Sequence, residues 1–249
     1  MVKVLAAGVN NTDINTRVGW YSKDADSANP TGYGDTPSPW PLIQGTDGFG
    51  LTPDGTRVLV RSSTLRGWYG SDFPGFFQQY CLVDAKDVHP VPDCCALTDS
   101  QLGVIPCAYG TAENMLLRAG VGAGDRVVVP GCSGGVAGAV IELCVARGCE
   151  EVVGVTSSEE KAKGLRESGA IGGHAVSLDI RTVYLKDLKV LGSTTWGEGV
   201  MGNLIKYLGE GKLDPEVRRT FKLKEIKEAQ ECFGERKRGG KIVLLPWDL

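Results

Sequence analysis

The sequence predicts an α/β fold in which a twisted β domain is joined to a parallel, doubly wound sheet. Residues 126–130 form a short apolar run, and a glycine-rich turn at 131–138 leads into a helical pattern. The same order recurs with an apolar run over 151–155 and a helix over 157–167. Two successive strand–helix units favour a parallel sheet. The first hundred residues instead carry short β-like runs separated by Gly and Pro, which is typical of a small β domain.

The elements of the β domain follow from local composition. Strands are expected over 2–7, 57–61 and 79–83, and Pro53-Asp54-Gly55 is a turn sequence. Isolated aromatic residues more often fill a core or an interface than a cleft. We expect this of Trp20, Trp40, Trp68 and Trp196.

The parallel sheet begins with the strand at 126–130. The helix after the turn repeats apolar residues at a period of about 3.6. Its predicted buried face consists of Val136, Val140, Ile141, Cys144 and Val145. The strand over 151–155 is expected to be buried, and Ser157 to Glu160 form a capping box for the next helix. Further along, we expect strands over 188–193, 217–223 and 241–245, and helices over 198–208 and 224–233.

Composition narrows the functional classes. The chain has 249 residues, of which 42% are hydrophobic and 23% charged, as in an ordinary globular protein. Its net charge of −3 argues against binding to nucleic acid or to an anionic membrane. No apolar stretch approaches the ~18 residues of a membrane span, and residues 1–20 lack the pattern of a signal peptide. The eight cysteines include no C-x-x-C pair. We therefore expect a cytoplasmic protein with reduced thiols.

The turn between the first parallel strand and its helix suits a phosphate group. Small residues over Cys132-Ser-Gly134-Gly-Val-Ala137 let the backbone approach a pyrophosphate while the first N–H groups of the helix face the anion. A purely structural turn is the alternative.

The residues that end the second strand suggest which dinucleotide is bound. Thr156, Ser157 and Ser158 are followed by Lys161, and hydroxyls with a cation suit a 2′-phosphate better than a free ribose. The sequence thus favours NADP(H) over NAD(H), although a helix N-cap beside a solvated lysine would look the same.

Residues 8–21 carry a longer pattern. They read GVNNTDINTRVGWY and resemble the G-V-N-x-x-D-x-x-x-R-x-G-x-Y segment of zinc-independent quinone oxidoreductases, which belong to the medium-chain dehydrogenase/reductase superfamily. Similar landmarks follow in the same order at Gly45-Thr-Asp-Gly48, Phe76-Phe-Gln-Gln-Tyr80, Cys107-Ala-Tyr-Gly-Thr111-Ala112 and Gly240-Lys-Ile-Val243. The resemblance implies a GroES-like domain over 1–112, completed by 213–249, and a shortened Rossmann domain over 113–212.

The resemblance also implies which residues form the site. Asn10, Asp13 and Tyr21 match positions that line the cleft near the nicotinamide and the substrate. Asn10 and Tyr21 would lie near the reacting oxygen, with Asp13 orienting them. The residues implied to bind the cofactor are Thr111, Ser133, Gly134, Gly135, Val136, Thr156, Ser157, Ser158 and Lys161. From the residues alone, Asn10 and Asp13 could equally belong to a loop that bonds its own backbone.

Zinc-dependent members of the superfamily place a cysteine where Asn10 stands and a His-Glu pair where Thr46-Asp47 stand. Only Cys107 remains as a ligand, and a catalytic zinc needs about three. We therefore expect no zinc.

The chain is short relative to this pattern. The family's opening hairpin, part of the strand near Gly50 and about two strand–helix units after Val176 are expected to be missing. Loss of the second half of a Rossmann domain would open the nicotinamide pocket and expose a sheet edge.

The resemblance implies that the chain is an NADP(H)-dependent oxidoreductase that reduces an activated C=C or C=O in a small quinone or enone. It also implies a homodimer. Two alternatives remain at this point: a non-catalytic relative, and a cofactor-independent isomerase or cyclase.

Overall fold

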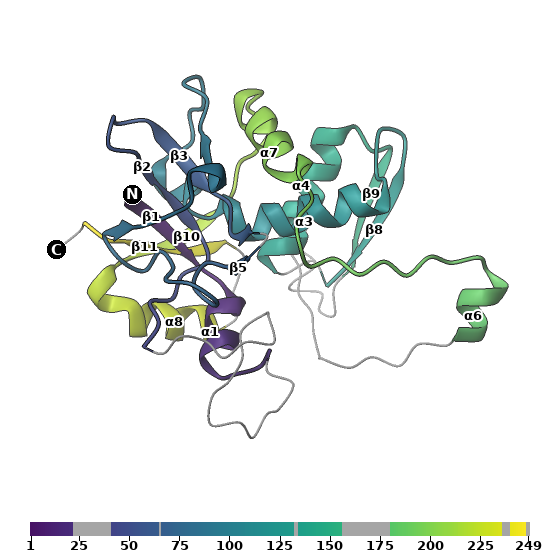
Figure 1. Cartoon of the computed structure of the whole chain (residues 1–249). Helices are drawn as coiled ribbons and strands as arrows, with labels where there is room; N and C mark the ends of the chain where they lie inside the picture. Colours follow the sequence, from purple (N-terminus) through teal and green to yellow (C-terminus); the bar gives the residue numbers. More distant parts are fainter. Residues whose placement is uncertain (22–40, 65, 132–133, 156–179, 236–239, 248–249) are drawn as a thin grey trace.

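The computed structural model describes most of the chain. The described residues are 1–21, 41–64, 66–131, 134–155, 180–235 and 240–247. Figure 1 shows a mixed β-sheet flanked by α1 and α8, and beside it a group of helices that carries a small two-stranded sheet.

The larger sheet is centred on β1. Its strands are β1 (Val2–Val9), β2 (Gly48–Leu51), β3 (Arg57–Val60), β6 (Tyr80–Cys81), β7 (Val88–Pro90), β10 (Val217–Lys222) and β11 (Lys241–Leu245). Their order is β10-β11-β1-β2-β3-β7, and β6 also pairs with β1. β1 is antiparallel to β2, β6 and β11, whereas β10 and β11 are parallel. The sheet therefore brings the start of β11 beside the end of β1, where the polar residues of the site lie.

The smaller sheets and the helices complete the fold. β4 (Ser63–Thr64) pairs with β5 (Gly67–Trp68), and β8 (Arg126–Pro130) pairs in parallel with β9 (Glu151–Val155). The helices are α1 (Asn11–Arg17), α2 (Asp99–Leu102), α3 (Ile105–Ala119), α4 (Gly135–Arg147), α6 (Ile180–Leu185), α7 (Gly199–Gly209) and α8 (Ile226–Gly234), with short 3-10 helices η1 (Ala85–Asp87) and η2 (Leu223–Glu225). Of the helices described, none is long and apolar enough to cross a membrane.

Glycine ends the two longest helices. α3 stops at Gly120 and α4 at Gly148, both in the left-handed region with φ of 69° and 78°. α3 packs on α4 and α7, and their shared core includes Leu143, Met201 and Leu204. A second core lies between the larger sheet and α8. Because α3 spans 105–119, it crosses the domain boundary expected at 112–113.

Two of the tryptophans fill the core, as predicted. Trp68 and Trp196 are buried and meet edge to face, with ring centroids 5.6 Å apart. Trp196 also lies against Gly110 of α3, where a Cβ atom would overlap its ring. Trp20 is about half exposed, and Trp40 lies outside the described residues.

The buried face of α4 differs from the predicted one. Its fully buried residues are Ala139, Leu143 and Cys144, whereas Val145 is 68% exposed. Val145 lies nine residues after Val136, about two and a half turns along the helix, and so points to the opposite side. The prediction was wrong for Val145.

Three strand predictions also differ from the structure. The strand over 151–155 forms, but most of its residues are exposed because α4 covers only one face of the β8–β9 sheet. Residues 188–193 form no strand and run as extended coil instead. The strand expected over 79–83 is reduced to Tyr80–Cys81. The capping box at 157–160 and the helix expected over 157–167 lie outside the described residues.

Candidate active site

The site forms where β1 ends and α1 begins. Asn10 is the N-cap of α1 in an extended conformation, with φ of −126° and ψ of 159°. Asp13 lies three residues later, and its carboxylate accepts a hydrogen bond of 2.7 Å from the backbone N–H of Asn10. Both side chains are buried. The short helix therefore fixes two of the three cleft residues that the sequence singled out.

The side-chain amide of Asn10 connects two charged groups. Its nitrogen donates to Asp47 Oδ2 at 2.6 Å and to the carbonyl of Gly8 at 3.3 Å, while its oxygen accepts from Lys241 Nζ at 2.7 Å. An amide has only two N–H donors, and both are used here. The expected contact between the Asn10 amide and a substrate oxygen does not fit this geometry, because Asn10 instead links Asp47 to Lys241.

Asp47 provides the buried carboxyl group at the centre of the site. Its Oδ1 atom accepts from the backbone N–H of Cys107 at 2.6 Å, in the first turn of α3. A carboxylate is favoured at a helix N-terminus because unpaired N–H groups gather there. Gly8 is required beside it, since a Cβ atom at that position would overlap Asp47 Oδ2.

Among the described residues, the hydrogen bonds to the Asp13 carboxyl group come from neutral donors. In addition to Asn10, the backbone N–H and the hydroxyl of Thr46 donate to its Oδ1 atom at 3.1 and 3.0 Å. Burial raises the pKa of Asp13 to about 7; the negative charge of Asp47 adds to this rise and the hydrogen bonds oppose it.

Two further groups have shifted pKa values. Burial also raises the pKa of Asp47, and the nearby Lys241 charge offsets part of that rise. Burial, together with the negative charge of Asp47, raises the pKa of the Cys107 thiol well above its usual value. Cys107 is therefore a neutral thiol at physiological pH.

Tyr21 is tied to α1 rather than to Asp13. Its hydroxyl donates to Thr12 Oγ1 at 3.2 Å and accepts from Asn15 Nδ2 at 3.4 Å. The carboxylate of Asp13 therefore positions the Asn10 backbone, and Thr12 and Asn15 position Tyr21. Tyr21 is the one member of the predicted trio whose side chain keeps partial exposure.

The glycine turn meets this cluster through Lys241. Gly134 is the N-cap of α4, and no side chain caps the helix there. A Cβ atom on Gly135 would lie 2.9 Å from Lys241 Nζ. Lys241, the first residue of β11, thus lies between the N-terminus of α4 and Asn10. It was not among the predicted site residues, although it stands in the Gly240-Lys-Ile-Val243 landmark.

The structure describes only some of the other residues that were predicted to bind the cofactor. Thr111 lies on α3 one turn after Cys107 and is half-buried, as is Val136 in the first turn of α4. The remaining ones, Ser133, Thr156, Ser157, Ser158 and Lys161, lie outside the described residues. Within the described ranges, no group of three or more His, Cys, Asp or Glu side chains is arranged to hold a metal ion.

Known proteins are similar to this chain in sequence and in fold. Residues 137–244 match the family model described as zinc-binding dehydrogenase. The acryloyl-coenzyme A reductase of Metallosphaera sedula is 27% identical, with 77% of this chain and 73% of that protein covered. The quinone oxidoreductase of Pongo abelii is 31% identical, with 86% and 55% covered. A crystal structure from Sinorhizobium meliloti, assigned as an alcohol dehydrogenase, has a TM-score of 0.82 at 28% identity and covers 98% of this chain and 87% of that one. The chain is a member of the medium-chain dehydrogenase/reductase superfamily.

This dehydrogenase/reductase chain has the two parts of the superfamily fold. The larger sheet is the GroES-like part, and the β8–β9 pair with α3 and α4 is the Rossmann-type part. The chain spans about half the length of the quinone oxidoreductases that it matches. Members of the superfamily are oxidoreductases that use a nicotinamide cofactor.

Proposed function

We propose that this chain binds NADP(H) and reduces an activated C=C or C=O of a small quinone or enone by hydride transfer. One observation carries the proposal: Lys241 lies between the N-terminus of α4 and the buried Asn10–Asp47 pair. A phosphate site and a polar site are thereby combined in one place. The names of the similar proteins, which include acryloyl-coenzyme A reductases and quinone oxidoreductases, support the same reaction class.

The residues present fit a dinucleotide. The N-cap of α4, Gly134, has no side chain to cap the first N–H groups, Gly135 leaves the backbone without a Cβ atom, and the Lys241 ammonium group lies beside it. This is the arrangement that holds an anion at a helix N-terminus. When bound, the reduced nicotinamide would supply the hydride. The preference for NADP(H) rests on the sequence at Ser157, Ser158 and Lys161.

The chain's own residues would bind the pyrophosphate of the cofactor and orient the substrate. Lys241 contacts the Asn10–Asp47 pair, and Asn10 accepts only one of the three Lys241 N–H donors. The other donors are suited to a pyrophosphate oxygen. The Tyr21 hydroxyl, which keeps partial exposure, would turn its one O–H from Thr12 Oγ1 to the oxygen that gains negative charge during reduction.

We propose that this chemistry proceeds without zinc. At the positions of the zinc ligands stand an amide, a carboxylate that already accepts two hydrogen bonds, and a neutral buried thiol. A lysine ammonium group contacts the same cluster. Zinc requires deprotonated ligands and repels a neighbouring cation, so this set does not fit it.

A non-catalytic relative is the second candidate. In the described part of the chain the Rossmann-type sheet has two strands, β8 and β9, and one of its faces is exposed. A protein that has kept the scaffold but lost turnover would bind neither nucleotide. A cofactor-independent isomerase or cyclase would instead convert its substrate in the absence of NADPH.

Titration of the purified protein with NADPH, and separately with NADH, tests the proposal. Nicotinamide fluorescence and the shift in the thermal midpoint report the binding. Lys241→Met should weaken both nucleotides about tenfold or more, because the pyrophosphate is common to both. Lys161→Ala should weaken NADPH alone, and the exposed Lys224→Ala is the matched control. A folded protein that binds neither nucleotide would exclude the reductase and favour the second candidate. If NADPH binds, a screen of quinones and enones follows NADPH oxidation.

A further inference from the structure

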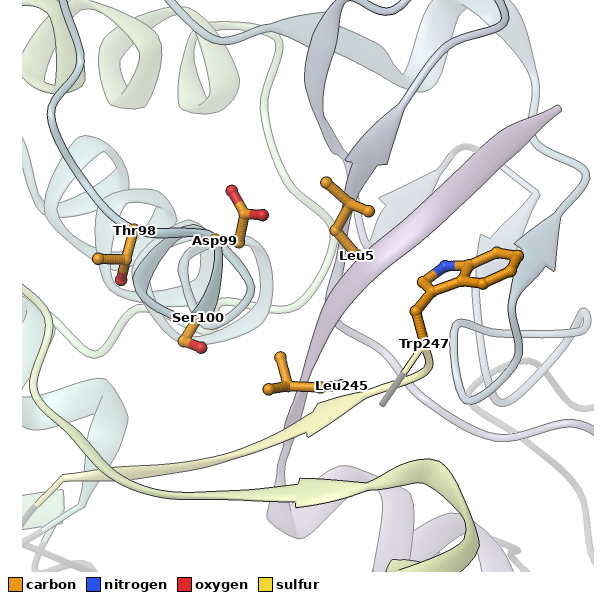
Figure 2. Close-up of a pocket in the computed structure, with 6 residues that line it drawn as sticks. All are labelled: Leu5, Thr98, Asp99, Ser100, Leu245 and Trp247. Atoms are coloured by element: carbon orange, nitrogen blue, oxygen red, sulfur yellow. The ribbon is translucent and has the colours of Figure 1, made fainter. Parts of the chain in front are cut away.

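Outside the candidate active site, the described part of the chain has a surface pocket and a pair of adjacent thiols. The pocket, of about 390 Å³, lies between the start of α2 and the strands β1 and β11, and Figure 2 shows Leu, Thr, Asp, Ser and Trp side chains around it. None of these labelled side chains is a thiol. The thiol pair is Cys144 and Cys149, at the end of α4. Because thiols can give up electrons and form covalent bonds with one another, the pair has a chemistry that the pocket lining lacks.

The end of α4 turns the chain back so that these two cysteines meet. Cys144 is in the last turn of the helix, and Cys149 follows Gly148, which ends the helix with φ of 78°. The backbone N–H of Gly148 donates to the carbonyl of Val145 at 3.0 Å, and that of Cys149 donates to the carbonyl of Cys144 at 3.1 Å. These two bonds define a Schellman motif, in which the residue after the glycine contacts the residue that accepts its N–H. The backbone therefore places the side chain of Cys149 against that of Cys144.

The two thiols are close enough to be joined. They are in hydrogen-bonding contact with each other, and Cys149 Sγ also donates to the carbonyl of Gly122 at 3.4 Å. A disulfide needs Cα atoms about 4.4–6.8 Å apart, and the direct backbone hydrogen bond between Cys149 and Cys144 meets this condition. Formation of a disulfide therefore requires rotation of the two side chains rather than a new backbone conformation.

The two thiols differ in their access to solvent. Cys149 is partly exposed and can meet a dissolved oxidant, whereas Cys144 is fully buried. Burial raises the pKa of the Cys144 thiol to about 12, and the neighbouring Cys149 thiol adds to this rise. Cys144 is therefore a protonated thiol behind an accessible one. This is the arrangement of a resolving thiol beside a thiol that reacts first.

We propose that Cys149 and Cys144 form a reversible disulfide when a hydroperoxide oxidises the chain, and that this bond spares Cys149 from irreversible oxidation. The Cys149 sulfur takes the terminal oxygen of the hydroperoxide, the O–O bond breaks, and an alcohol leaves with the thiol proton. The Cys144 sulfur then attacks the resulting sulfenic acid, the S–O bond breaks, and hydroxide leaves as water with the Cys144 proton. Two thiols and one hydroperoxide thus give one disulfide, one alcohol and one water, and two electrons pass from sulfur to oxygen. A dithiol reductant restores both thiols.

Peptide mapping tests the disulfide because Arg147 lies between the two cysteines. Trypsin cuts after Arg147, so that residues 127–147 and 148–161 separate unless a disulfide joins them. The mapping uses the full chain with Cys132→Ser, since Cys132 would otherwise share the first peptide with Cys144. After treatment with tert-butyl hydroperoxide and alkylation of the remaining thiols, both peptides should be lost as alkylated species and recovered as one linked pair. Dithiothreitol should separate this pair.

Two further variants separate the roles of the thiols. With Cys144→Ala the resolving thiol is gone, and Cys149 should gain two oxygen atoms as an irreversible sulfinic acid. With Cys149→Ala the buried Cys144 should stay reduced. Cys232 is the matched control, because it is partly exposed like Cys149 and its sulfur accepts a hydrogen bond from the Arg218 guanidinium group at 3.3 Å. Its oxidation should be the same in every variant.

Thermal unfolding confirms that each variant folds, and the mapping of the chain that keeps both thiols does not depend on the Cys144→Ala variant. Three outcomes would each overturn the proposal. The first is a pair of peptides that stays reduced while Cys232 is oxidised. The second is sulfinic acid at Cys149 in the chain that keeps Cys144. The third is a Cys149 that is oxidised to the same product with and without Cys144.

Discussion

Lys241 donates a hydrogen bond of 2.7 Å to the side-chain oxygen of Asn10, so that the first residue of β11 is joined to the residue that follows β1. The two residues are 231 positions apart in the sequence. Asn10 in turn donates to Asp47 at 2.6 Å, and these three residues form a chain of cation, amide and carboxylate in which Asn10 and Asp47 are buried and Lys241 is partly buried. The stability of the site and its capacity to bind an anion therefore depend on the same lysine.

Removing the Lys241 charge should destabilise the protein. Lys241→Met leaves the Asp47 carboxylate buried without its cation and the Asn10 oxygen without a donor, at an expected cost of about 1–3 kcal/mol in the free energy of unfolding. The double variant with Asp47→Asn should lose less than the sum of the two single variants, because the unpaired charge is gone. Urea denaturation measures all three. Strict additivity would show that Lys241 and Asp47 do not interact.

The stability of the protein should fall as pH rises through the range in which Asp13 titrates. Its pKa is about 7 when folded and near 3.8 when unfolded, so the folded state binds the proton more tightly. The contribution is complete below pH ~4 and is lost by pH ~7, with a slope of up to about 1.4 kcal/mol per pH unit. Between pH 5 and 7, Asp13→Asn should reduce the slope of the free energy of unfolding against pH by up to about 1.4 kcal/mol per pH unit, which corresponds to one proton. An unchanged slope would mean that Asp13 is ionised throughout.

The local elements were predictable because their signals are local. β1, β8, β11 and α7 follow from apolar runs and helical period, and Asn10 and Asp13 meet because they are three residues apart at the start of one helix. Lys241 was not predicted as a site residue, since its contact with Asn10 depends on the pairing of β11 with β1. The burial of β9 was predicted wrongly because its composition is that of a central strand, whereas only one face is covered.

A buried ion pair joins α3 to α4, and removal of one of its two partners should strongly lower the free energy of unfolding. Arg147 donates to Glu113 at 2.5 Å, and Asn203 of α7 donates to the same oxygen at 2.6 Å. Arg147→Met leaves a fully buried carboxylate without a cation, which should cost about 3–5 kcal/mol. Lys206→Met breaks the exposed Lys206–Glu210 pair and should cost less than about 1 kcal/mol. Equal losses in urea denaturation would contradict the difference in burial.

Two glycines within helices should respond oppositely to alanine. At Gly110 a Cβ atom would overlap the ring of Trp196, which is buried against α3 and meets Trp68, so Gly110→Ala should destabilise by about 1–3 kcal/mol. At Gly202 on α7 nothing lies within 4 Å of the added atom, and Gly202→Ala should stabilise by about 0.5–1 kcal/mol through helix propensity. Thermal and urea unfolding of both variants measure the contrast. Replacing Trp196 by Leu should relieve most of the Gly110→Ala penalty, because the smaller side chain leaves room for the methyl group. If the penalty persists with Leu at position 196, its origin lies in the backbone of α3 instead.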